Sequence, residues 1–340
     1  MPLFPASPAR GCVPVLNSAC PWASSEEDLR ALWDCEWTSA VTTRTTTLHG
    51  FPDDPSKHQV AFFGSDAQSS ANSFGYSPFP LSTYIAWLRP LVLSTPPAKR
   101  KQVIVSITGT LSETVALLAQ LRAFAAELDT VLAVEFNASC PNLGHLGHPP
   151  PAYVEDELRQ FLALLAEHAS DSLKVGVKLP PYTYEEQFAA VGRALSSVGD
   201  RHAKEHPISF LTATNTLGQG LVFSSQMSAV PSCAVAQQPP KSATFALPGG
   251  SGGLAGAAIH HTSLGNVYRL SRLLRDEGVQ DRRLGSISLI GVGGASDAES
   301  VERFRLAGAD AVACATALGR EGVRVFEKMA RGRAPMRAKL

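Results

Sequence analysis

The sequence predicts an α/β fold in which eight parallel strands alternate with helices and close into a single (β/α)8 TIM barrel. Short apolar, β-branched runs recur along the 340 residues, and helical patterns separate them. No G-x-G-x-x-G turn follows the first run, so an open doubly wound sheet is the less favoured alternative. We therefore expect one domain over residues 1–340, with an irregular segment at 1–12 and long loops at the carboxyl face of the barrel.

The eight strand candidates share one pattern. Each is a mostly apolar run that ends in small or polar residues, as expected of a parallel strand that is buried on both faces. In a barrel, the carboxyl ends of the strands form the face where the chemistry takes place. The predicted strands are residues 13–18, 39–45, 102–109, 131–139, 173–180, 208–216, 287–294 and 310–318.

Helices are predicted between the strands from capping patterns and from apolar residues at helical spacing. The capping patterns are Ser24-x-x-Glu27, Thr110-x-x-Glu113 and Thr183-x-x-Glu186. Further helices are expected at residues 152–168, 263–276, 297–307 and about 320–331. Two long connections remain, at 46–101 and 217–262, and we expect them to be loops that act as lids.

The composition argues against several classes of protein. Hydrophobic residues make up 44% of the chain and charged residues 18%, which favours a large core over disorder. The 30 basic and 30 acidic residues balance, so no nucleic-acid partner is expected, and no apolar run is long enough to span a membrane. The six cysteines form no C-x-x-C pair, which is typical of a reduced, cytoplasmic protein without a zinc site.

The most informative motif closes the fourth predicted strand and reads Asn137-Ala-Ser-Cys140-Pro-Asn142. It places two amides, a hydroxyl and a thiol at the reactive face of the barrel. A thiol there can serve as a nucleophile or as a general acid or base, and asparagine can pair with an amide or imide edge. A single cysteine is more often a small buried apolar residue, but the flanking asparagines favour a functional role for Cys140.

Other polar residues follow neighbouring strands. Lys178 lies near the end of the fifth strand, where an ammonium group is costly unless it meets an electron-rich cofactor ring or a carboxylate. Asn72 and Asn215 are either ordinary turn residues or converge with the asparagines around Cys140 on one planar ligand. His145 and His148 lack a carboxylate at metal-binding spacing, so no metal is expected.

Three turns rich in small residues lie in the late part of the chain, at 249–253, 291–294 and 315–317. Glycine lets backbone amides approach an anion closely, and late-strand loops are the usual phosphate site of a barrel. A single G-x-G-G pattern is a weak signal because glycine also makes ordinary turns. Two such turns together with Thr316 favour a phosphate-binding site.

Taken in order, these motifs resemble class 1A dihydroorotate dehydrogenases, the cytosolic FMN enzymes that commonly use fumarate as electron acceptor. The motif around Cys140 is similar to that family's N-x-S-C-P-N, whereas the membrane-bound class has serine at this position. The resemblance covers roughly residues 13–330. Further matches lie at 16–19, 72–75, 177–182, 215–221, 252–256, 291–294 and 316–318.

The resemblance implies FMN-dependent oxidation of dihydroorotate to orotate in pyrimidine biosynthesis, by a cytoplasmic homodimer with fumarate as acceptor. Cys140 would remove the C5 proton while a hydride leaves C6 for flavin N5. The implied substrate-binding residues are Asn72, Ser73, Gly75, Asn137, Asn142, Asn215 and Arg44. The implied cofactor-binding residues are Ala19, Arg44, Asn137, Lys178, Thr216, Gly252, Gly253, Gly293, Gly294, Ala315 and Thr316.

The chain departs from the family pattern at several positions. Arg44 stands where the family has a lysine, Pro78 where it has an asparagine, and His260 where it has a lysine. The segment after Cys140 reads Leu-Gly-His-Leu-Gly-His instead of the family's Pro-Gly-Lys type. Two alternatives therefore stay open: an FMN barrel that acts on another cyclic amide or enone, and a flavin-binding paralogue without turnover.

Overall fold

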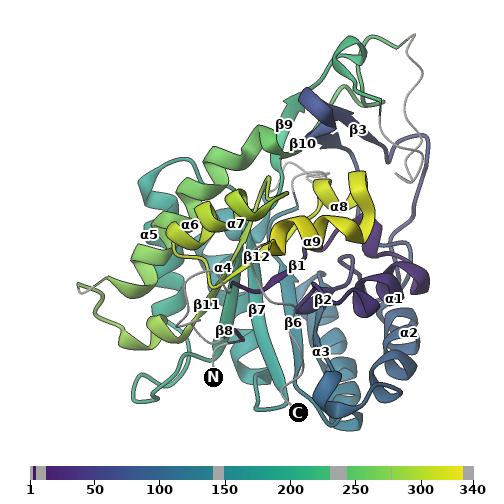
Figure 1. Ribbon diagram of the computed structural model, residues 1–340. Helices are drawn as coiled ribbons and strands as arrows, with labels where there is room; N and C mark the ends of the chain where they lie inside the picture. The colour runs from purple at the N-terminus through teal and green to yellow at the C-terminus, as the bar shows by residue number, and fades with distance from the viewer. Residues whose placement is uncertain (1–2, 5–12, 141–148, 230–242, 277, 332–340) are drawn as a thin grey trace.

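Eight parallel strands close into a barrel, which confirms the predicted fold class (Figure 1). The structure is a computed structural model that describes residues 3–4, 13–140, 149–229, 243–276 and 278–331. The strands follow the order β1-β12-β11-β8-β7-β6-β5-β2 around the barrel. Their bounds are Val15–Asn17 (β1), Ala40–Thr42 (β2), Gln102–Ile107 (β5), Leu132–Asn137 (β6), Leu173–Leu179 (β7), Ile208–Ala213 (β8), Ser288–Val292 (β11) and Ala311–Cys314 (β12).

Helices surround the barrel, and the sequence predicted most of them (Figure 1). Helix α2 was not predicted, because it lies inside the connection that was expected to be a loop. The predicted helix at 320–331 is instead two short helices, α8 and α9. The helices are Glu26–Asp34 (α1), Leu81–Leu93 (α2), Leu111–Glu127 (α3), Glu155–His168 (α4), Glu185–Ser196 (α5), His260–Arg275 (α6), Ala298–Leu306 (α7), Thr316–Glu321 (α8) and Val325–Ala330 (α9).

One of the three predicted capping boxes is confirmed. Thr110 and Glu113 cap α3 reciprocally: Thr110 Oγ1 accepts from Glu113 N at 3.3 Å, and Glu113 Oε2 accepts from Thr110 N at 2.8 Å. The box at α1 is formed one residue later than predicted, by Ser25 and Asp28. At α5 the side chain of Gln187 accepts hydrogen bonds from the backbone amides of Thr183 and Tyr184, so the prediction for Glu186 was wrong.

The core has two parts because successive strand residues face opposite ways. Residues such as Val175 and Val177 of β7 face the helices and belong to the largest apolar cluster. Residues such as Ile104 face inward and form a separate cluster with Phe4. Phe4 N and O each lie 3.1 Å from the hydroxyl oxygen of Ser288, at the start of β11, so Phe4 closes the amino end of the barrel.

The two long connections are not simple loops. They contribute the strands Val60–Phe63 (β3), Ser69–Asn72 (β4), Leu217–Leu221 (β9) and Ser251–Gly256 (β10), which form a second, antiparallel sheet in the order β3-β4-β10-β9. Figure 1 shows β3, β9 and β10 beyond the carboxyl end of the barrel. The expectation of loop-like lids was therefore wrong, and a small sheet roofs this side of the barrel instead.

Three further observations concern the described residues only. No helix among them is long and apolar enough to cross a membrane. No group of three histidine, cysteine or acidic side chains is arranged there to hold a metal ion. Cys20, Cys35, Cys140 and Cys314 are not joined in disulfides. That residues 1–340 form one domain stays a prediction.

Candidate active site

Two adjoining cavities open at the carboxyl end of the barrel. Their empty volumes, open mouths included, are about 620 and 700 Å³, within the usual range for small-molecule sites. We call the first the late-strand cavity, since the ends of β11 and β12 line it, and the second the thiol cavity, since Cys140 lines it. Both are lined by Ala19, Lys178, Asn215, Thr216, Ala255, Ala315 and Thr316, so they form one continuous slot.

The turn after β11 supplies backbone donors to the late-strand cavity. Gly293 and Gly294 have φ angles of +133° and +79°, a backbone region that residues other than glycine rarely adopt. A Cβ at Gly293 would also lie 2.0 Å from Ser263 Oγ. The amides of Gly293, Gly294 and Ala295 donate to no other described residue. Successive unpaired amides of this kind suit an anion.

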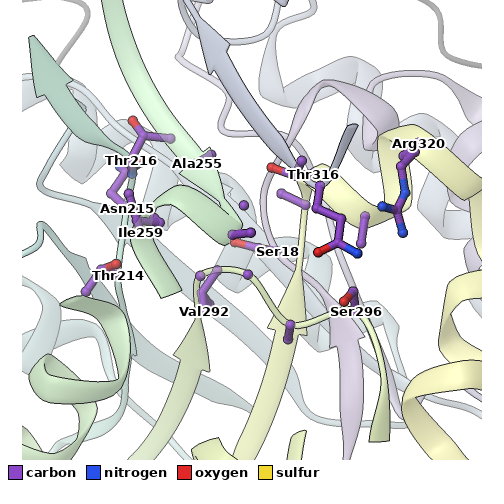
Figure 2. Close-up of a pocket in the computed structure, with 18 of the residues that line it drawn as sticks. Ser18, Thr214, Asn215, Thr216, Ala255, Ile259, Val292, Ser296, Thr316 and Arg320 are labelled. Atoms are coloured by element: carbon purple, nitrogen blue, oxygen red, sulfur yellow. Dashed lines mark hydrogen bonds between the residues drawn. The ribbon is translucent and has the colours of Figure 1, made fainter. Parts of the chain in front are cut away.

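Arg320, Ser296 and Thr214, which the sequence did not single out, complete the late-strand cavity. Figure 2 shows Arg320 and Ser296 on one side of it, and Thr214 and Asn215 on the other. Arg320 follows the predicted Thr316 by one helical turn, and its Nη1 donates to Asp66 O at 2.9 Å. The guanidinium also pairs with Glu321, which Lys328 contacts as well, so this group of three keeps one net positive charge near the unpaired amides and favours an anionic group such as a phosphate.

His260, one of the departures from the family pattern, supports the glycine turn. Its Nδ1 lies 2.8 Å from Gly293 O and its Nε2 lies 3.1 Å from Arg303 Nε. A carbonyl can only accept and Arg303 Nε can only donate, so the ring is neutral with its hydrogen on Nδ1. Burial lowers the pKa of His260, in agreement with a neutral ring.

Lys178 lies where the two cavities meet. Its side chain is 4% exposed, and Nζ donates to Ser18 Oγ at 2.9 Å. It forms no ion pair with any described residue. Burial of an ammonium group without a counter-charge costs on the order of several kcal/mol of folding free energy. The position of Lys178 therefore favours an electron-rich or anionic group in the slot.

Arg44 places a second buried cation on the same slot. It is 7% exposed, and its guanidinium donates to Gly75 O at 3.1 Å and to Ser24 Oγ at 3.4 Å. The guanidinium carbon also lies 5.4 Å from the centre of the Phe74 ring. Arg44, like Lys178, pairs with no carboxylate among the described residues. Burial lowers the pKa of Arg44, as expected of a cation that is withdrawn from water.

The predicted asparagines converge on the thiol cavity. Asn215 Nδ2 donates to Asn137 Oδ1 and to Ser139 Oγ, both at 3.1 Å, and Asn137 Nδ2 donates to Thr45 Oγ1 at 3.0 Å. Asn72 lines the cavity from β4 of the small sheet, together with Gly75. Asn72 and Asn215 also take part in local turns, since Asn72 Oδ1 accepts from Phe74 N at 3.3 Å and Asn215 Oδ1 from Thr216 N at 2.8 Å, so the two interpretations do not exclude each other. Asn142, which follows Cys140, lies outside the described residues.

Three predicted residues line neither cavity. The hydroxyl of Ser73 accepts from Gln59 N at 3.1 Å and is used within the β3–β4 hairpin. Gly252 and Gly253 lie inside β10, where Gly253 pairs with Asn72 and a Cβ at Gly252 would lie 2.4 Å from Asn72 O. These glycines allow β4 and β10 to pack closely. The residues of this segment that line the slot are Ala255, Gly256 and Ala257.

The small sheet is fixed to the barrel at the slot itself. Ser70 Oγ of β4 lies 2.8 Å from Thr316 Oγ1, the first residue of α8. Ala257 N, just after β10, donates to Gln68 O at 2.9 Å. The slot therefore has walls from both sheets. The strands of its far wall, β3, β4, β9 and β10, were not predicted, although the resemblance implied Asn72 of β4 as a site residue.

Comparison with known proteins agrees with this geometry. The family model described as dihydroorotate dehydrogenase matches residues 13–334. A Trypanosoma cruzi protein named dihydroorotate dehydrogenase (fumarate) is 29% identical over 318 residues, which cover 93% of this chain and 87% of the relative. A Streptococcus pyogenes protein named putative dihydroorotate dehydrogenase A (fumarate) is 27% identical, with 93% and 86% covered. The chain belongs to the dihydroorotate dehydrogenase family.

Proposed function

We propose that this protein oxidises (S)-dihydroorotate to orotate in pyrimidine biosynthesis, with FMN as cofactor and fumarate as the final electron acceptor. The observation that carries the proposal is the slot itself, which brings two buried cations, three asparagines and a thiol to one place. The names of the relatives, which include fumarate, support the choice of acceptor.

The described residues fit FMN. The amides of Gly293, Gly294 and Ala295, with Arg320 nearby, would hold the phosphate at the late-strand cavity. Lys178 and Arg44 would face the ring system and would stabilise the negative charge that it carries when reduced. When bound, FMN would supply the hydride acceptor for the hydrogen at C6 of the substrate.

The residues of the thiol cavity would orient the substrate and take its proton. Asn72, Asn137 and Asn215 present amide donors and acceptors that match the amide and imide edges of dihydroorotate. Cys140, as a thiolate, would accept the C5 proton, so that loss of a proton from C5 and a hydride from C6 leaves a C5–C6 double bond. The positive charge of Arg44 in the same cavity favours the thiolate form.

A cytoplasmic homodimer and a single-domain chain belong to the same proposal. The family resemblance supports the homodimer and the cytoplasmic location. The second sheet supports a single domain, because it is hydrogen-bonded to the barrel at the slot through Ser70 and Thr316. Sedimentation of the FMN-loaded protein tests the assembly, and a monomer at micromolar concentration would contradict it.

The test of the proposed reaction is the visible spectrum of the purified protein without oxygen. We expect a flavin spectrum that bleaches on addition of dihydroorotate and returns on addition of fumarate. Dithionite provides the control that the flavin can be reduced at all. A flavin that bleaches with dithionite but never with dihydroorotate would favour another cyclic amide or enone as substrate, which Arg44 at the thiol cavity gives a reason to consider.

A further inference from the structure

A third cavity adjoins the thiol cavity on the other side of Cys140. It holds about 1380 Å³ of empty space with its open mouth, and we call it the outer cavity. Tyr76, Asn137 and Cys140 line both the thiol cavity and the outer cavity, so they form the partition between the two. The outer cavity is otherwise lined by residues such as His49, Thr108, Glu113 and Glu157.

Tyr76 lies beside one hydroxyl-bearing and one thiol-bearing residue. Thr108 and Cys140 line the outer cavity together with Tyr76, and both affect the pKa of its phenol. Thr108 Oγ1 in turn donates to Asn137 O at 3.1 Å, so the hydrogen of Thr108 is already in use. Thr108 can therefore accept from Tyr76, and the phenol lies between this acceptor and the sulfur of Cys140.

The ring of Tyr76 is held in place from two directions. It meets the Phe51 ring edge to face, with centroids 5.8 Å apart and an interplanar angle of 81°. The preceding carbonyl, Gly75 O, accepts from Arg44 Nη2 at 3.1 Å. A Cβ at Gly75 would lie 2.1 Å from Phe51, so this approach depends on glycine. The position of the phenol relative to the sulfur is therefore built into the loop after β4.

The phenol stays protonated over the range in which a thiol ionises. Burial, more than the neighbouring Cys140, raises the pKa of Tyr76. A protonated phenol has one hydrogen, which it can give either to Thr108 or to the sulfur. A hydrogen bond to a thiolate is charge-assisted and stronger than one to a neutral hydroxyl. The hydrogen should therefore turn to the sulfur once Cys140 has lost its proton.

We propose that Tyr76 is a positioning residue for Cys140: its hydroxyl donates to the thiolate and connects the sulfur to the outer cavity. This inference rests on the proposed role of Cys140 as base. After Cys140 has taken the C5 proton, the thiol passes a proton to the Tyr76 oxygen while the phenol releases its own hydrogen to water in the outer cavity, which Tyr76 itself lines. The thiolate is regenerated, Tyr76 is unchanged, and one proton has left the site.

Several charged groups face Cys140 and share in setting its ionisation. Arg44 and Lys178 line the thiol cavity, whereas His49, Glu113 and Glu157 line the outer cavity. The contribution of Tyr76 has to be separated from these charges. Tyr76→Phe does so, because it removes one hydroxyl and leaves every charge in place.

The experiment measures the ionisation of Cys140 directly, in the FMN-loaded protein. Iodoacetamide reacts with the thiolate, so its rate against pH reports the midpoint of ionisation, and peptide mass spectrometry assigns the label to Cys140. In Tyr76→Phe we expect this midpoint to move about one pH unit toward alkaline values. The rate of flavin reduction by dihydroorotate at pH 7 should fall about tenfold and recover at higher pH.

Two further variants sharpen the test. Tyr182→Phe also removes a buried hydroxyl, which donates to Ala152 O at 2.7 Å, but Tyr182 lines neither cavity beside Cys140 and should leave both pH profiles unchanged. Thr108→Val removes the competing acceptor for the phenol hydrogen. It should shift the midpoint in the acid direction, so it decides the question even where Tyr76→Phe does not fold.

The outcomes separate this inference from the proposed function. An unchanged labelling midpoint in Tyr76→Phe, or an alkaline shift in Thr108→Val, overturns the role of Tyr76 whatever the substrate is. If flavin reduction in Cys140→Ala is as fast as in the parent protein, the proposed base is wrong. The labelling midpoint still decides in that case whether Tyr76 sets the ionisation of the thiol.

Discussion

The late-strand cavity and the thiol cavity lie side by side but are built in different ways. The first is built largely from backbone amides and small residues such as Gly293, Gly294 and Ala315. The second is built from the side chains of Arg44, Asn137 and Cys140. Backbone donors depend on chain conformation, whereas side-chain chemistry changes with a single substitution. Cofactor retention and substrate reactivity should therefore separate on mutation.

The largest effect is expected from Cys140→Ala, which removes the proposed base and leaves the late-strand cavity intact. We expect reduction of the flavin by dihydroorotate to slow by about 100- to 10,000-fold, the usual contribution of a positioned base. The FMN content of the purified protein should not change. Anaerobic rapid mixing measures the rate, and absorbance after denaturation measures the content. Loss of FMN together with the rate would show that the two cavities are not separable.

Lys178→Met tests the place where the cavities meet. Loss of a charge-assisted contact worth about 1.5–3 kcal/mol should weaken FMN binding by roughly 10- to 100-fold. The protein without FMN should be at least as stable as the parent, since the variant removes a buried cation that has no partner among the described residues. Thermal unfolding with and without FMN measures both effects.

A matched control for Lys178→Met lies on the same strand. Lys174 of β7 is near the amino end of the barrel and pairs with Asp171 at 3.7 Å, away from both cavities. Lys174→Met should leave the FMN affinity unchanged. Equal affinities in the Lys178 and Lys174 variants would mean that the ammonium group of Lys178 does not face the cofactor.

The sequence predicted the barrel better than the roof over it. All eight barrel strands were found, because apolar runs such as 102–107 and 173–179 recur at regular spacing. Strand β10 reads Ser-Gly-Gly-Leu-Ala-Gly, and glycine has a low strand propensity, so its role in a sheet was not visible. Its pairing with β4 bridges residues about 180 positions apart, as in Asn72 with Gly253, and no local pattern reports that.

The same contrast holds within the site. Cys140 and Asn137 were found because they share one motif at a strand end, and Lys178 because a lysine interrupts an apolar strand. Arg320 and Tyr76 were missed because each reaches the slot from a segment outside the barrel strands. Gly252 and Gly253 were assigned to the cofactor because a glycine-rich run looks the same whether it holds an anion or lets two strands pack.

The smallest effect is expected at His260, where the backbone-built cavity depends on one side chain. Burial lowers the pKa of His260 below its ordinary value of 6.5, so the folded protein favours the neutral ring. The support it gives Gly293 is present above about pH 6.5 and is lost as the pH falls through the lowered pKa. Protonation would place a hydrogen on Nε2, against the donor Arg303 Nε at 3.1 Å.

His260→Ala should weaken FMN binding about threefold at pH 7.5, the scale of one neutral hydrogen bond. As the pH falls through the lowered pKa of the imidazole, its affinity should then fall less steeply than that of the parent, because the phosphate titrates in both proteins but the imidazole in only one. His206 gives the control: burial lowers its pKa too, but it lies beside the start of β8, bonded to Leu195 O at 3.0 Å. His206→Ala should alter acid stability without altering FMN affinity. If the FMN affinities of His260→Ala and the parent fall in parallel with pH, the glycine turn does not depend on His260. The backbone alone would then set the shape of the late-strand cavity.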